Sequence, residues 1–135
     1  MNDSVLAKFT KRPEGEAASP TENDESDDLG VFGWLRGVRD RAVMLELRHK
    51  DGAISALGYA WLERAEFNPS DGIVLHFAGK TVKITGRNLN AEVRPNKRLF
   101  TGITRHRVPW VQEADGPTAI TASPRDVVID EINVK

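Results

Sequence analysis

The sequence predicts a mostly β domain, a small barrel or sandwich of about seven short strands with one short N-terminal helix. Apolar and polar residues alternate with a period of two over most of the chain after residue 42. Turn-forming stretches such as Asp-Gly and Asn-Pro-Ser-Asp-Gly separate these segments at short intervals. The chain of 135 residues is also long enough to bury a core as one domain.

Charge is segregated along the chain, although the net charge is only -1. Residues 1–28 contain eight acidic and three basic residues, whereas residues 29–135 contain 12 acidic and 16 basic residues. Residues 10–28 hold no large apolar side chain, so burial there cannot offset the entropy lost on ordering. We therefore predict an acidic disordered tail over residues 1–28 and a β-barrel-like domain over residues 29–135.

The predicted helix lies in residues 29–41. Its apolar residues recur at helical spacing and are Val31, Trp34, Leu35 and Val38. Asp28 stands where an N-cap residue would stand. Three glycines in this stretch oppose a helix, because each costs about 1 kcal/mol relative to alanine.

The strands follow from the change of period. We expect them over residues 43–48, 53–62, 73–77, 81–85, 89–93, 99–104, 107–111 and 126–134. Residues 53–62 are apolar on both faces, which predicts a central strand with a bend or bulge at Gly58. Gly79-Lys80-Thr81 looks like the end of a phosphate-binding loop, but both flanks alternate like strands, so we interpret it as a hairpin turn.

Several classes of function are disfavoured by what the sequence lacks. There is no cysteine, which excludes a disulfide framework, a thiolate zinc site and a cysteine nucleophile. His49, His76 and His106 have no metal-ligand spacing, and no serine lies in a Gly-x-Ser-x-Gly motif. No run of roughly 18 apolar residues predicts a membrane span. We expect a cytoplasmic protein that is not an enzyme, binds no cofactor or metal and has no membrane partner.

A basic stretch is the strongest candidate for a binding function. Residues 73–112 contain eight basic residues and a single acidic one, Glu92. Closing a small barrel would gather many of these cations at one rim, where they would attract the phosphates of RNA or another polyanion. The candidate residues are Lys83, Arg87, Arg94, Lys97, Arg98, Arg105 and Arg107. Phe100 and Trp110 would either stack on bases or belong to the core.

The sequence leaves a second hypothesis open, that of a protein-interaction or scaffold module with no nucleic-acid role. Residues 54–62 carry more apolar and aromatic side chains than one barrel interior needs. Such a module would assemble into a homo-oligomer, a ring or a dimer, through an exposed strand edge.

Parts of the sequence resemble two known families. The segment Phe32–Arg41 looks like a short N-terminal helix, and Val82–Leu89 looks like the second Sm motif. Over residues 30–90 the chain thus resembles the Sm-like, Hfq-like group of small β-barrels. This resemblance implies RNA binding by two loops, with Asn68 and Asp71 in the first and Gly86 and Arg87 in the second. Thr85 stands where that group has an arginine.

The second resemblance covers residues 58–111. The matching stretches are Ile73-Val-Leu75, Ile84-Thr-Gly-Arg-Asn-Leu89 and Leu99-Phe-Thr-Gly-Ile103. They are similar to the YabP/YqfC family of spore-forming bacteria, whose members are small and β-rich. This likeness implies a fold and no particular chemistry.

Overall fold

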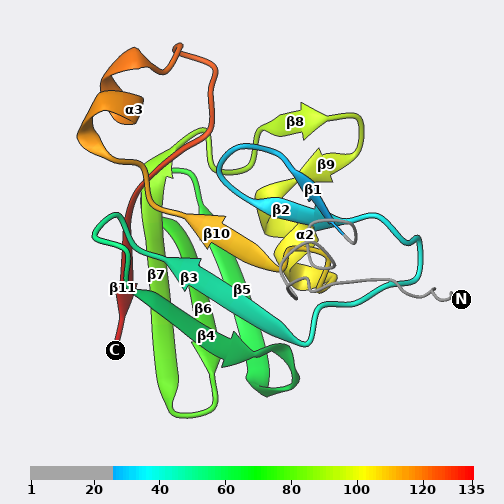
Figure 1. The fold of residues 1–135 in the computed structure, drawn as a ribbon. Coiled ribbons are helices and arrows are strands. Elements are labelled where there is room, and N and C mark those ends of the chain that lie inside the picture. The colour runs from blue at the N-terminus through cyan, green and yellow to red at the C-terminus, as the bar shows by residue number, and fades with distance from the viewer. Residues whose placement is uncertain (1–25) are drawn as a thin grey trace, which may run out of the picture.

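The computed structural model describes residues 26–135, which form a mostly β fold (Figure 1). The strands are β1 Ser26–Asp28, β2 Gly33–Leu35, β3 Met44–Arg48, β4 Ile54–Gly58, β5 Leu62–Asn68, β6 Gly72–Phe77, β7 Lys80–Arg87, β8 Glu92–Arg94, β9 Lys97–Arg98, β10 Trp110–Gln112 and β11 Val128–Val134. The helices are the 3₁₀ turn η1 Tyr59–Trp61, α2 Leu99–Thr104 and α3 Gly116–Thr121. The predicted fold class is confirmed in its sandwich-like form, since the sheets of residues 26–135 do not close into a barrel.

The larger sheet is antiparallel, with the strand order β11-β7-β6-β5. A tight turn joins β6 to β7, and the φ of 78° at Gly79 confirms the predicted hairpin. Ile73 pairs with Ile84, and Leu75 pairs with Val82. All four side chains are fully buried, so the alternation of the strands places one row of aliphatic residues in the core.

The smaller sheet has the order β10-β3-β4. β3 and β4 form an antiparallel hairpin around Gly52, as the Asp-Gly pair predicts. β10 lies parallel to β3, with Val111 opposite Leu47. Both of these residues and Leu45 are fully buried, so this sheet turns its aliphatic face toward the larger one.

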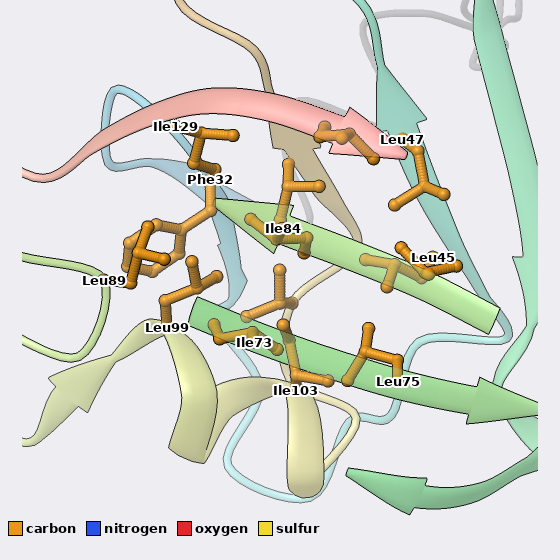
Figure 2. Close-up of a cluster of buried hydrophobic side chains, with 14 of the residues drawn as sticks. Phe32, Leu45, Leu47, Ile73, Leu75, Ile84, Leu89, Leu99, Ile103 and Ile129 are labelled. Atoms are coloured by element: carbon orange, nitrogen blue, oxygen red, sulfur yellow. The ribbon is translucent and has the colours of Figure 1, made fainter. Parts of the chain in front are cut away.

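The core lies between the two sheets, and α2 packs against it from one side (Figure 2). Leu99 and Ile103 stand one helical turn apart on α2 and are fully buried beside Ile73. Burial of a side chain of this size contributes about 1.5–3 kcal/mol. Tyr59 is also in the core, where its hydroxyl donates to the Val108 carbonyl at 2.6 Å. Burial raises the pKa of Tyr59, so this hydroxyl remains a donor.

A buried carboxylate, that of Glu113, links the two sheets. Its side chain is only 6% exposed and follows β10 directly. One carboxylate oxygen accepts from the Lys50 N–H at 2.8 Å, in the β3–β4 turn, and the other accepts from the Ile132 N–H of β11 at 2.7 Å. Burial by itself raises the pKa of Glu113, but the two N–H groups and the charges of His49 and Lys50 lower it below its ordinary value.

The predicted N-terminal helix is wrong. Residues 33–35 form β2, which pairs antiparallel with β1, and Val38 is 88% exposed instead of completing an apolar stripe. Gly33 is held against the ring of Trp110, where a Cβ atom would overlap the indole. The packing of Gly33 against Trp110, which is distant in sequence, thus outweighs the helical spacing of the apolar residues in this segment.

The strand predicted over residues 99–104 is also wrong, because this segment is the helix α2. Its Gly102 lies beneath the ring of Trp34, where any side chain would collide with the indole. The predicted central strand over residues 53–62 is divided as well. β4 ends at Gly58, where the bend was expected, and it lies at the edge of its sheet instead of the centre.

The boundaries of the remaining predictions shift by a few residues. Strand structure in the predicted segments 89–93 and 107–111 is confined to β8 and β10, whereas β11 confirms the last predicted strand. The last three residues of the stretch predicted as a disordered tail form β1, Ser26–Asp28, so the prediction is wrong for these residues. The rest of that predicted tail, residues 1–25, lies outside the described residues. No helix within residues 26–135 is long and apolar enough to cross a membrane.

Replacing Glu113 by alanine should lower the free energy of unfolding by about 2–3 kcal/mol, because two backbone N–H groups lose their acceptor. Glu113→Gln keeps one acceptor oxygen and should fall between alanine and the wild type. Urea unfolding followed by circular dichroism measures both values. A loss below about 0.5 kcal/mol for the alanine variant would contradict the proposed link.

The same two variants test how the stability contributed by Glu113 depends on pH. The folded pKa of Glu113 is lowered, so its contribution to stability is complete above the unfolded value of about 4.3 and is lost as the pH falls through the folded pKa. The stability of the wild type should therefore decline more steeply in acid than that of Glu113→Gln. Parallel curves for the two proteins would contradict this assignment.

Candidate polyanion-binding site

Three cations from different parts of the chain interact electrostatically with Asp27, the central residue of β1. Arg36 follows β2 and its Nε donates to the Asp27 carboxylate at 2.7 Å. Arg94 in β8 and Lys97 in β9 act on the same carboxylate. The hydrogen bond from Arg36 is the largest effect and lowers the pKa of Asp27. Burial opposes it, and the charges of Arg36, Arg94 and Lys97 each lower the pKa by a smaller amount. We call Asp27, Arg36, Arg94 and Lys97 the Asp27 cluster.

The fold brings this cluster together through the ring of Trp34. Trp34 lies opposite Asp27 in the β1–β2 pair, and its ring is buried. Lys97 extends over that ring, with Nζ 5.7 Å from the ring centroid. The attraction between an ammonium group and an aromatic face thereby holds the β8–β9 hairpin close to β2.

A cleft of about 1060 Å³ adjoins the Asp27 cluster. Its walls are β1, the loop after β2 and the outer face of the smaller sheet. Four arginines and four acidic residues line it, and these are Arg36, Arg41, Arg48, Arg94, Asp27, Asp28, Asp40 and Glu46. The cleft is thus balanced in formal charge as a whole, while the positive excess is concentrated at the Asp27 cluster.

The two aromatic residues of the basic stretch are both occupied within the fold. The Arg48 guanidinium lies 4.5 Å from the centroid of the Trp110 ring, and it also pairs with Glu46 at 3.0 Å. Phe100 is half-buried and packs against Phe67, with 5.9 Å between ring centroids. The structure therefore favours a structural role for these rings over base stacking.

The structure gathers only some of the seven predicted cations. Arg94 and Lys97 belong to the Asp27 cluster. Lys83 lies on the outer face of the larger sheet, where its register partners are Val74 and Asn133. Arg98 donates to the Asn90 carbonyl at 2.9 Å, and Arg105 is exposed at the end of α2. These positions do not form one rim of the kind the sequence analysis expected.

Arg107 has a structural role. Its guanidinium donates to the carbonyls of Gly37, of Leu35 at 2.7 Å, of Asp40 at 2.9 Å and of Val38 at 3.1 Å. One cation thus holds the whole loop after β2 in place, and this loop is the segment that was predicted to be helical. Its donors are engaged with backbone oxygen atoms, so it is a poor candidate for contact with phosphate.

The four residues of the Sm-like loops lie near a second, smaller cleft of about 540 Å³. Asp71 and Gly86 line it, so the β5–β6 turn and the end of β7 meet there. The Asn68 side chain is engaged in its own turn by the Ser70 N–H at 2.8 Å. Arg87 instead donates to the Ala119 carbonyl of α3 at 2.9 Å. No basic side chain of residues 26–135 lines this cleft, which makes it a poor site for phosphates.

Sequence reasoning missed Arg36, Arg41 and Arg48. The first two fall in the predicted helix, and Arg48 falls in the strand predicted over residues 43–48. The signal that was available is the cluster of arginines in residues 36–41, at the start of the folded domain.

The histidines do not form a metal site with their neighbours. His106 stacks on Tyr59, with ring centroids 4.4 Å apart, and its pKa is lowered by burial and by the charge of Arg41. His76 pairs with Glu66 at 3.2 Å on the outer face of the larger sheet. Across residues 26–135 no group of three or more histidine and acidic side chains could hold a metal ion.

Comparison of the chain with protein-family models, with curated proteins and with solved structures finds no match. The resemblances to the Sm-like group and to the YabP/YqfC family therefore stay predictions. The function has to be inferred from the site itself.

Replacing Arg107 by methionine should lower the free energy of unfolding by about 2 kcal/mol, because charged hydrogen bonds to several carbonyls are lost. Arg105→Met is the matched control, since Arg105 is an exposed arginine two residues before Arg107, and it should change stability by less than about 0.5 kcal/mol. Chemical unfolding measures both. Equal losses of stability in the two variants would contradict the structural role of Arg107.

Proposed function

We propose that the protein is a non-catalytic module that binds a polyanion at the Asp27 cluster and the adjoining cleft. RNA is the polyanion that we favour. The observation that supports it most is the Arg36–Asp27 ion pair at 2.7 Å, to which Arg94 and Lys97 of the β8–β9 hairpin add two further positive charges that act on the same carboxylate. Phosphate oxygens accept charge-assisted hydrogen bonds as carboxylates do. Arg94 and Lys97 can therefore contact phosphate while Arg36 remains paired with Asp27.

The cleft supports an extended ligand. Its volume is near the upper end of the range of about 300–1000 Å³ that is common for ligand pockets. Arg48 lies over the Trp110 ring inside it, and a guanidinium plane can itself stack on a base. A bound RNA strand would run across β1 and β3, with its phosphates at the Asp27 cluster and its bases along the cleft.

Neutralising two cations of the cluster tests this assignment. The double variant Arg94→Gln with Lys97→Gln should weaken binding of a fluorescein-labelled single-stranded RNA of about 12 nucleotides by at least tenfold in low salt. The slope of log affinity against log salt should also fall by about 1.4, which corresponds to two phosphate contacts. Fluorescence anisotropy over a series of salt concentrations measures both.

The matched control is the double variant Lys80→Gln with Lys83→Gln. It removes the same charge from two exposed positions of β7, away from the cluster. It should leave the salt slope close to that of the wild type. If both double variants weaken RNA binding equally, the net charge of the protein attracts RNA. The Asp27 cluster is then not the binding site. If the wild type does not bind RNA in low salt, the proposed function fails.

The acidic N-terminal segment should compete with the polyanion. Residues 1–25 contain six acidic and three basic residues, and they join the fold directly before Asp27. Removing residues 1–25 should tighten RNA binding and steepen its salt dependence, because a nearby source of negative charge is lost. The deletion must stop before Ser26, since residues 26–28 form β1.

A charge-only variant separates length from charge in this experiment. Changing Glu22, Asp24 and Glu25 to the corresponding amides keeps the segment and removes three negative charges. It should tighten binding in the same direction as the deletion. Unchanged affinity of both proteins in low salt would rule out the competition.

A further inference from the structure

The outer side of β4 is an open sheet edge. β4 is last in the order β10-β3-β4, and no other strand of residues 26–135 pairs with its outer side. At either end of the hairpin, the Tyr59 N–H donates to the Val43 carbonyl and the His49 N–H donates to the Ala53 carbonyl. Because peptide groups alternate in direction along an antiparallel strand, those of Ile54, Ala56 and Gly58 face away from β3.

β4 also lacks the protection that edge strands usually have. Natural edges are commonly blocked by charged side chains or by proline, which discourage pairing with another chain. The edge strand of the larger sheet follows this rule, since β5 carries Glu63, Arg64 and Glu66. β4 has the sequence Ile-Ser-Ala-Leu-Gly, with neither charge nor proline. The contrast between these two edge strands indicates that β4 pairs with a strand of another chain.

The outer face beside this edge exposes apolar side chains next to the Glu46–Arg48 ion pair of β3. Ile54 is 60% exposed, Trp61 is 64% exposed and Met44 is 45% exposed. Met44 lies opposite Gly58 in the β3–β4 pair, so the missing side chain of Gly58 belongs to the same face. The Trp61 ring borders this position, because a Cβ on Gly58 would lie 3.0 Å from its Cδ1 atom. Gly58 therefore has no side chain of its own on this face, and the Trp61 ring lies against its position.

We propose that β4 pairs antiparallel with β4 of a second copy of this chain, with the two Ala56 residues opposite each other. In this register Ile54 of each copy lies opposite Gly58 of the other. The exposed Ile54 side chain then lies beside Gly58, where no side chain blocks it, and contacts Trp61 of the second copy. In this pairing the outward N–H and C=O groups of Ile54, Ala56 and Gly58 form the hydrogen bonds between the two copies. The hydrogen bonds between β3 and β4 therefore stay intact.

The strand itself identifies a second copy as the occupant. A two-fold axis through Ala56 matches the largest outer side chain of β4 with its glycine at both ends. The absence of charge on β4 means that no like charges meet across the axis. The two smaller sheets would merge into one continuous sheet with the order β10-β3-β4-β4-β3-β10. None of the Asp27 cluster residues takes part, although Met44 and Ala56 also line the adjoining cleft. Dimerisation is measured without RNA, so this proposal can fail while RNA binding holds, and the reverse.

The first experiment measures the mass of the full-length protein against concentration by sedimentation velocity. The wild type should form a dimer. Ile54→Lys should raise the dissociation constant at least about 100-fold, because a charge replaces the apolar contact at both ends of the pair. Ile120→Lys is the matched control, since Ile120 is 85% exposed on α3, and it should leave dimerisation unchanged. Thermal unfolding of each monomer checks that the fold is intact.

A charge-swap experiment tests the register. Ala56→Lys alone and Ala56→Glu alone should both be monomers, because like charges would face each other across the axis. Mixing the two variants should restore a dimer of one copy of each, which native mass spectrometry identifies. A wild type that stays monomeric at all concentrations would overturn the proposal, whether or not another protein binds this edge. Retention of the dimer in Ile54→Lys, or failure of the mixture to pair, would overturn it as well.

Discussion

The fold depends on a seam formed by two residues, Glu113 and Ala114. The Glu113 N–H donates to the Arg48 carbonyl at 2.8 Å, and the Ala114 N–H donates to the Ile129 carbonyl at 2.8 Å. This short segment thus bonds to both sheets through its backbone. The buried carboxylate of Glu113 reinforces the same seam from the side chain. Because β10 directly precedes the seam, the position of Trp110 and of the cleft beside it is set there as well.

Local patterns were enough to predict the parts of the fold that are held by local contacts. The β6–β7 hairpin is an example, since alternation and Gly79 specify it within about 15 residues. The segments 29–41 and 99–104 were predicted wrongly because their conformation is decided elsewhere. Arg107 holds the first segment through carbonyl oxygens, and Trp34 covers Gly102 in the second. No periodicity within a segment can reveal such distant partners.

The candidate site was predicted in part for the same reason. A count of charges identified Arg94 and Lys97, which do meet near Asp27. It also selected Lys83, which is on another face, and Arg107, which is engaged with the backbone. Arg36 was missed because its partner lies in a stretch assigned to the tail. Composition shows that cations are abundant, while the fold decides which of them become neighbours.

The parallel pairing of β10 with β3 has a consequence for the order of folding. Trp110 lies opposite Glu46, so the two strands are separated by more than half of the described chain. Contacts this far apart in sequence form slowly, since a long loop has to close before they contribute to stability. On a ribosome the β5–β6–β7 meander can assemble before β10 is synthesised, whereas the smaller sheet and its cleft form only once β10, Trp110–Gln112, has been made. Stalled or truncated chains should therefore expose an unpartnered β3–β4 hairpin.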